Sequence, residues 1–148
     1  MNLTARAKIV FRASPERAFG AFADPQLMSR FWFTRHDQGL QEGKMVAWYI
    51  GDGPEAPAID VRVKEIKHPT RLHIEWGQGG QFTDVLWTFE RTDAGDTIVQ
   101  IVESGFALEG DALLARVLDS TAGFNQVILA AKALVEHDTS INVVADHV

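Results

Sequence analysis

The last long segment of the chain predicts one amphipathic helix, and this helix limits the possible folds more than any other feature. No proline occurs from Glu109 to His137, and apolar residues recur at the spacing of one helical face. Asp111 near its beginning and His137 near its end suit the helix dipole. The residues expected on the repeating face are Leu114, Val117, Leu118, Thr121, Phe124, Ile128, Ala131 and Val135. Such a face must be buried, so the rest of the chain has to form the surface that covers it.

The residues before this helix predict an antiparallel β-meander. Apolar and polar residues alternate in six segments, and turn-forming residues rather than helices separate most of them. The predicted strands cover residues 4–12, 44–50, 58–66, 71–76, 82–90 and 97–104. Alternation with a period of two places one side of each strand on the apolar face of a sheet.

Two short helices are predicted between the first two strands. Ser14-Pro15 and Asp24-Pro25 each combine an N-cap with a proline at the first helical position. They predict helices from Pro15 to about Ala23 and from Pro25 to about Phe31. Helices of this length cannot cover six or seven strands, so the long helix must lie across the sheet.

The predicted fold is therefore α+β, a curved antiparallel sheet of six or seven strands wrapped around the long C-terminal helix. A twisted sheet that grips one helix is rarely filled completely by side chains, so we expect a cavity between the two. Residues 1–148 are expected to form a single domain, with residues 139–148 as a C-terminal tail.

Composition argues against several classes of function. The formal net charge is −6 without a cluster of Lys and Arg, which disfavours nucleic acids and anionic membrane surfaces. The chain has no cysteine, its five histidines lack the spacing of metal ligands, and it has no nucleotide-binding motif, so we expect no metal and no other cofactor. The longest apolar segment, Val127 to Val135, is too short to span a bilayer, and no signal peptide is recognisable. A cytoplasmic protein without membrane insertion is expected.

Several segments resemble the START-like (SRPBCC) superfamily, and within it the branch of the activator-of-heat-shock-ATPase homologue domain. The resemblance extends over nearly the whole chain. It lies in residues 13–25, Val63 to Leu72, Trp76, Val85 to Glu90, Thr97 to Phe106, Asp119 to Phe124, and Ala131 to His137. Phe19 and Phe124 stand where the family commonly has tryptophan. The resemblance implies the helix-grip fold. Members of this superfamily include co-chaperone domains, polyketide cyclases and aromatases, and lipid carriers.

The expected binding site combines aromatic and apolar residues that the spacing places inward, with one acid among them. These residues are Phe31, Trp32, Phe33, Trp48, Trp76, Trp87, Ile101, Glu103, Phe124 and Ile128. The aromatic side chains suit a hydrophobic ligand, although plain core packing is the simpler interpretation of each one alone.

Two residues leave alternatives open. Glu103 follows the inward positions Val99 and Ile101, where a carboxylate needs a hydrogen bond, an ion pair or a proton. It is interpreted either as a ligand anchor or acid–base group, or as a strand-end residue that reaches solvent or pairs with an arginine. Gly123 interrupts the long helix. It either leaves room for a ligand or a hinge, or allows close approach of a strand or a partner subunit, and the second interpretation is favoured.

The leading hypothesis is binding of a small hydrophobic or aromatic molecule, lipid- or polyketide-like, in a cavity between the sheet and the C-terminal helix. The alternatives are a co-chaperone-like protein-interaction domain and an enzyme similar to the cyclases or hydrolases of the same fold. An exposed apolar patch over a filled interior would favour the first alternative. A second polar group converging with Glu103 would favour the enzyme. A homodimer is compatible with the sequence.

Overall fold

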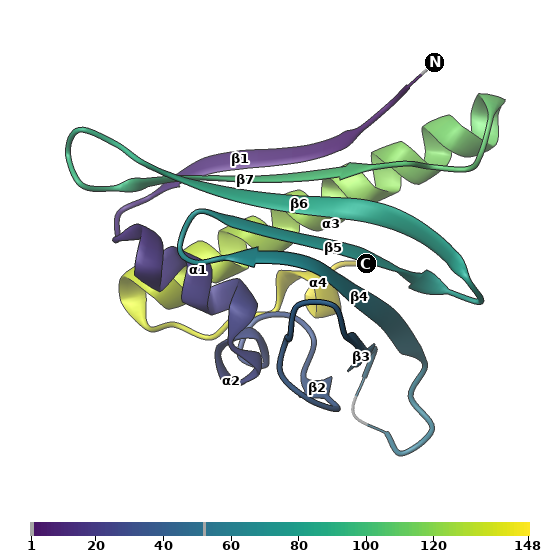
Figure 1. Ribbon diagram of the computed structural model, residues 1–148, viewed down its shortest axis with the longest axis horizontal. Helices are drawn as coiled ribbons and strands as arrows, with labels where there is room; N and C mark the ends of the chain where they lie inside the picture. The colour runs from purple at the N-terminus through teal and green to yellow at the C-terminus, as the bar shows by residue number, and fades with distance from the viewer. Residues whose placement is uncertain (1, 52) are drawn as a thin grey trace.

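A seven-stranded antiparallel sheet curves around one long helix in the computed structural model, which describes residues 2–51 and 53–148 (Figure 1). The elements in chain order are β1 (Ala5–Phe11), α1 (Pro15–Ala23), α2 (Pro25–Met28), β2 (Arg35–His36), β3 (Met45–Tyr49), β4 (Ala58–Lys67), β5 (Arg71–Gln78), β6 (Gln81–Arg91), β7 (Thr97–Ser104), α3 (Gly110–His137) and α4 (Val143–Asp146). The strand order is β1-β7-β6-β5-β4-β3-β2, so consecutive strands pair except that β1 joins the far side of β7. The predicted α+β fold is confirmed.

The two N-terminal helices begin where the sequence predicts. The Ser14 side chain accepts a hydrogen bond from the backbone N–H of Arg17 at 3.3 Å, and Asp24 accepts one from that of Gln26 at 2.9 Å. Each cap precedes a proline at the start of its helix. The second helix ends at Met28, earlier than predicted, because the chain turns there and carries Phe31 and Trp32 into the core.

The long helix α3 lies closest to the backbone of the sheet at the edge strand β1. Two small inward residues of β1, Ala5 and Ala7, are buried and allow this approach. Polar side chains of α3 also hydrogen-bond the free edge of β1 and the residue that follows it, Arg12. The bonds are Asn125 Nδ2 to the Arg6 carbonyl at 3.1 Å, Lys132 Nζ to the Val10 carbonyl at 2.6 Å, and the Arg12 N–H to Glu136 Oε2 at 3.0 Å.

Glu136 takes part in this contact between α3 and β1 as a carboxylate anion. Burial alone would raise its pKa, but hydrogen bonds from Lys132 and the Arg12 N–H, with the charge of Lys132, outweigh burial and hold the pKa below its usual range. The helix is therefore attached to β1 by hydrogen bonds as well as by packing.

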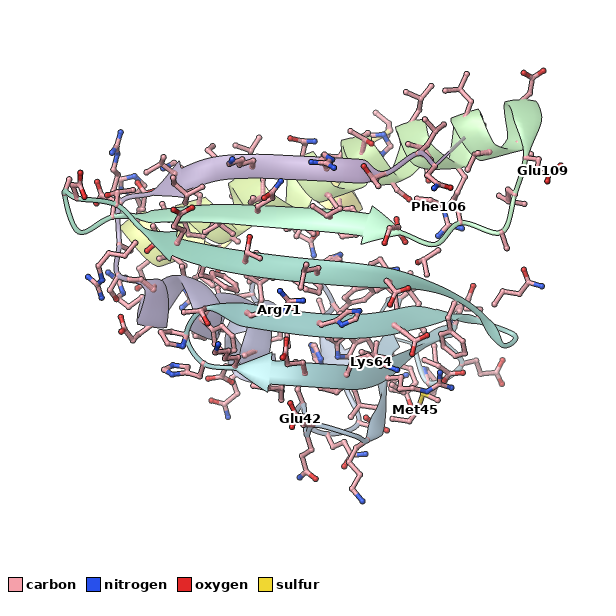
Figure 2. The ribbon with its side chains drawn as sticks, turned by 45° about the horizontal axis from the view of Figure 1, so that its top comes forward. Glu42, Met45, Lys64, Arg71, Phe106 and Glu109 are labelled. Carbon is pink, nitrogen blue, oxygen red and sulfur yellow. The ribbon has the colours of Figure 1, made fainter. Side chains whose placement is uncertain are left out.

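Large side chains fill the wider space between α3 and the remaining strands. Trp48, Trp87 and Phe31 are at most 1% exposed, and they pack with Phe22 and Ile128 in one continuous core. The predicted inner face of the helix is correct at Val117, Phe124, Ile128, Ala131 and Val135, which are buried, but wrong at two positions. Leu114 and Leu118 are 50% and 61% exposed. The first turns of α3 lie beyond the end of β7 (Figures 1 and 2), so little of the sheet is available to cover them.

The outer face of the sheet is charged and carries cross-strand ion pairs (Figure 2). Glu75 on β5 accepts from Lys64 at 3.1 Å and from Arg62 at 3.4 Å, both on β4. The hydrogen bond from Lys64 is the largest cause that holds the pKa of Glu75 below its usual range. This face is solvated, so the candidate binding site has to lie on the concave side. Within residues 2–51 and 53–148, no helix has the length and apolar character needed to cross a membrane.

We expect Trp87→Ala to lower the free energy of unfolding by about 3–5 kcal/mol, because truncating a fully buried indole leaves a cavity in the core. Trp87→Phe should cost much less, since the indole N–H has no hydrogen-bond partner among the described residues. Equilibrium urea denaturation of both variants measures the difference. A loss below ~1 kcal/mol for Trp87→Ala would show that the inner face has been assigned wrongly.

Candidate functional site

Trp32 lies at the centre of a cluster of aromatic rings between the sheet and α3. Its ring centroid is 5.7 Å from that of Trp76, 5.8 Å from Trp48 and 6.3 Å from Phe124. Phe33, the next residue, lies 4.7 Å from it. Trp32 and Phe33 lie in the turn after α2, Trp76 lies on β5, and Phe124 lies on α3. With Trp48 from β3, four separate parts of the chain thus bring aromatic side chains to one place.

A pocket of about 140 Å³ opens beside this cluster. Its walls are aromatic and aliphatic, with two polar residues of α3 at the rim. The lining residues are Trp32, Trp76, Asp119, Ser120, Gly123, Phe124, Val127 and Val144. This volume is less than half of the ~300 Å³ at which pockets for drug-sized ligands begin. The pocket therefore has space for one compact group rather than for a whole large ligand.

Gly123 is the residue of α3 that leaves this pocket open. A Cβ built on it meets no atom within 4 Å. The favoured interpretation, close approach of a strand, is therefore wrong within this chain. A Cβ at this position of the pocket wall would thus meet open space, and the glycine costs the helix up to about 1 kcal/mol relative to alanine.

The C-terminal segment forms one side of the pocket. Val144 of α4 lines it, and Asn142 Nδ2 donates a hydrogen bond to the Trp32 carbonyl at 2.9 Å. Arg30 pairs with Asp138 at 2.9 Å and holds the connection between α3 and α4 near α2. Val144 also lines a second, larger hollow of about 400 Å³, together with Trp32, Phe33, Tyr49, Ile50 and Ile59.

Glu103 is fully buried behind Trp76. Its Oε2 accepts hydrogen bonds from the Trp76 indole N–H at 2.9 Å and from the Thr83 hydroxyl at 2.5 Å, and it lies 3.6 Å from an Arg116 nitrogen. Its other oxygen, Oε1, has no hydrogen-bond partner among the described residues. Of the alternatives left open, pairing with an arginine is observed and exposure to solvent is not, since the side chain is 0% exposed. The carboxylate orients the indole of Trp76, because it accepts the only proton that this ring can donate.

Only some of the residues predicted for the site line the pocket. Trp32, Trp76 and Phe124 do, and Phe33 lines the neighbouring hollow. Five others are at most 1% exposed and belong to the core around the pocket: Phe31, Trp48, Trp87, Ile101 and Ile128. Asp119, Ser120, Val127 and Val144 were missed. The first two are polar helix residues with nothing to distinguish them from solvated ones, and Val144 comes from the tail, for which the sequence gives no position.

His36 on β2 lies beside this region. Its Nε2 is 2.8 Å from the Phe33 carbonyl, and its ring meets that of Trp48 edge-on at 5.8 Å. Burial lowers the pKa of His36 below its ordinary value, and the Phe33 carbonyl and the charge of Asp37 offset this only in part. The imidazole is therefore kept neutral in the folded protein over part of the mildly acidic range.

The chain matches the family model described as activator of Hsp90 ATPase homolog 1-like protein over residues 12–136. A search of curated proteins found no match. Among solved structures, the Aha1 dimer from Colwellia psychrerythraea aligns with a TM-score of 0.77 at 14% identity, covering 93% of this chain and 99% of that one. An HSP90 activator from Plasmodium falciparum aligns with a TM-score of 0.67 at 17% identity over 90% and 95% of the two chains. DynU16, from the dynemicin biosynthetic locus, aligns with a TM-score of 0.79 at 19% identity. The alignment covers 93% of this chain but only 48% of DynU16.

His36→Gln should make the free energy of unfolding less dependent on pH. The folded pKa of His36 lies below the unfolded value of ~6.5, so the unfolded wild type takes up a proton first as the pH falls, and stability is lost. The variant keeps a donor toward the Phe33 carbonyl but has no proton to take up. Urea titrations should show that the free energy of unfolding of the variant rises relative to that of the wild type as the pH falls from about 7 to about 5.5. Above about pH 7.5 the difference between the two should be constant. A constant difference throughout this range would contradict the assignment.

Proposed function

The chain belongs to the family of activator of Hsp90 ATPase homolog 1-like proteins, within the START-like superfamily, and from that premise we propose that it binds a small, mainly apolar molecule between its sheet and C-terminal helix. The observation that carries the proposal is the pocket beside Trp32, Trp76 and Phe124, with Gly123 open toward it. An α3 optimised for packing alone would have a larger side chain at position 123. A compact part of the ligand would occupy this pocket.

The residues around the pocket have separate roles in this proposal. Trp32, Trp76 and Phe124 supply contact surface, and Phe33 extends it past Val144 toward the neighbouring hollow. Glu103 acts through Trp76 as a positioning residue, because it holds the indole at the wall of the pocket. The buried residues Phe31, Trp48, Trp87, Ile101 and Ile128 support these walls from behind. A lipid- or polyketide-like identity of the ligand and a cytoplasmic location stay predictions.

Nuclear magnetic resonance of the ¹⁵N-labelled protein tests the proposal at the level of single indoles. The neutral probe 3,3-dimethylbutan-1-ol is compact enough to enter a small apolar pocket. Its titration should shift the indole N–H signals of Trp32 and Trp76, which line the pocket, more than that of the deeply buried Trp87. No shift in any indole signal up to the solubility limit would exclude the pocket as a site for such molecules. Native mass spectrometry of freshly prepared protein would reveal a ligand that stays bound.

We expect Gly123→Ala to stabilise the protein by up to about 1 kcal/mol and to weaken binding of the same alcohol by ~10-fold, because the new methyl group strengthens the helix and occupies the pocket. The matched control is Gly20→Ala in α1, whose Cβ would meet Leu27 at 3.8 Å, an ordinary contact, away from this pocket. The control should change stability without changing affinity. Unchanged affinity in Gly123→Ala would contradict the proposed position of the ligand.

A second candidate function is protein interaction through the outer face of α3. Leu114, Leu118 and Leu129 are 50%, 61% and 50% exposed, which is unusual for leucines on one helix. The Plasmodium falciparum relative is described as an HSP90 activator, which makes a heat-shock protein 90 the first partner to test.

If this face stimulates the chaperone's ATPase, replacing Leu114 and Leu118 together by serine should abolish the stimulation while leaving the free energy of unfolding within ~1 kcal/mol, since both side chains are exposed. Gly123→Ala should leave the stimulation intact, because that residue lines the pocket. A steady-state ATPase assay measures both. Equal stimulation by the double variant and the wild type would exclude this face.

A further inference from the structure

We propose that the ligand of the pocket carries a compact alkylammonium group, held against the aromatic walls and paired with Asp119. This inference rests on the proposed function and adds the chemical class of the ligand. It depends on the charges and ring orientations at the pocket.

Asp119 is the one charged residue among those that line the pocket. It is exposed at the rim, and it forms no ion pair within residues 2–51 and 53–148. A cation that enters the pocket would therefore meet a carboxylate that no arginine or lysine already neutralises.

The nearest arginine does not reverse this charge. Arg116 lies one helical turn before Asp119, but its guanidinium is 3.6 Å from Glu103, lies over the ring of Phe106 at 5.6 Å, and donates a hydrogen bond to the Ser120 hydroxyl at 3.3 Å. Figure 2 shows Phe106 in the connection that leads from β7 to α3. Since Arg116 and the buried Glu103 offset each other, the negative charge of Asp119 remains. The net charge of −6 for the whole chain acts in the same direction.

The walls of the pocket suit a cation that has lost part of its water. The ring of Trp32 is inclined by 66° to Trp76 and by 76° to Phe124, so aromatic groups bound the pocket from two directions. The negative π-faces of such rings attract ammonium groups by ~0.5–2 kcal/mol, most strongly for tryptophan, and quaternary ammonium is the usual ligand of such arrangements. A volume of about 140 Å³ favours a compact head group over a long chain or a fused ring system.

An anionic head group would meet unfavourable conditions. Asp119 at the opening repels a negative charge, and Glu103 behind Trp76 is already paired with Arg116. The pocket contains no lysine or arginine among its lining residues that could pair with a carboxylate or a phosphate. The geometry therefore favours amines over fatty acids.

Three probes of the same shape separate charge from apolar contact: choline (cationic), 3,3-dimethylbutan-1-ol (neutral) and 3,3-dimethylbutanoate (anionic). We expect affinity to fall in that order, with choline bound ~10-fold more tightly than the alcohol at low ionic strength. Titrations followed through the indole N–H signals of Trp32 and Trp76 give the dissociation constants. Added salt should weaken the binding of choline and leave that of the alcohol unchanged.

Asp119→Asn should reduce the affinity for choline by ~5- to 10-fold and change that for the alcohol by less than ~2-fold. Asp111→Asn is the matched control, since Asp111 is an exposed acid of the same helix in its first turn and does not line the pocket. It should leave all three affinities unchanged.

The outcomes distinguish the two proposals. If the alcohol binds as tightly as choline, or if Asp119→Asn leaves choline binding unchanged, the ammonium inference is overturned while the apolar site stands. If none of the three probes moves the indole signals, the proposed function itself is overturned. Preference for choline that is lost in Asp119→Asn but kept in Asp111→Asn supports the inference.

Discussion

The close approach of α3 to the edge strand β1 determines most of the remaining structure. Ala5 and Ala7 make β1 thin enough for the helix to lie against it, and hydrogen bonds from α3 to the strand's free edge hold it there. The helix then diverges from the strands on the other side of the sheet. This leaves a wedge-shaped space that small side chains could not fill. Tryptophan and phenylalanine fill its deep part, and the pocket is what remains at the open side.

The buried carboxylate of Glu103 determines the position of Trp76, which forms one wall of the pocket. A charged group in an apolar interior is costly unless it is paired, and here a tryptophan, a threonine and an arginine approach one of its two oxygens. In consequence Trp76 is held by a hydrogen bond in addition to its stacking on Phe124, whose centroid is 5.7 Å away at an angle of 24°. The wall of the pocket is thus more rigid than apolar packing alone would make it.

The sequence predicts the elements well because their periodicities are strong and local. Six strands and three helices appear with ends within a few residues of the predicted ones, whereas β2, of two residues, and α4, of four, are too short to produce a pattern. The exposed Leu114 and Leu118 could not be predicted, since hydrophobic spacing does not reveal that a helix extends past the sheet that covers it. Alternation places Trp48, Trp76 and Trp87 on the same side, but only the curvature of the sheet decides that Trp76 lines the pocket and the other two support it. The contribution of Val144 depends on the tail folding back, held by Asn142.

The hydrogen bonds from α3 to β1 also affect how two molecules could meet. Unpaired backbone groups along a sheet margin are the usual template on which a foreign β-segment adds. On the β1 side, Asn125, Lys132 and Glu136 already occupy three of these groups. At the opposite margin the outermost strand is β2, only two residues long, with Arg35 and His36 as its members. Neither margin offers a long free ladder, so the fold resists intermolecular strand addition.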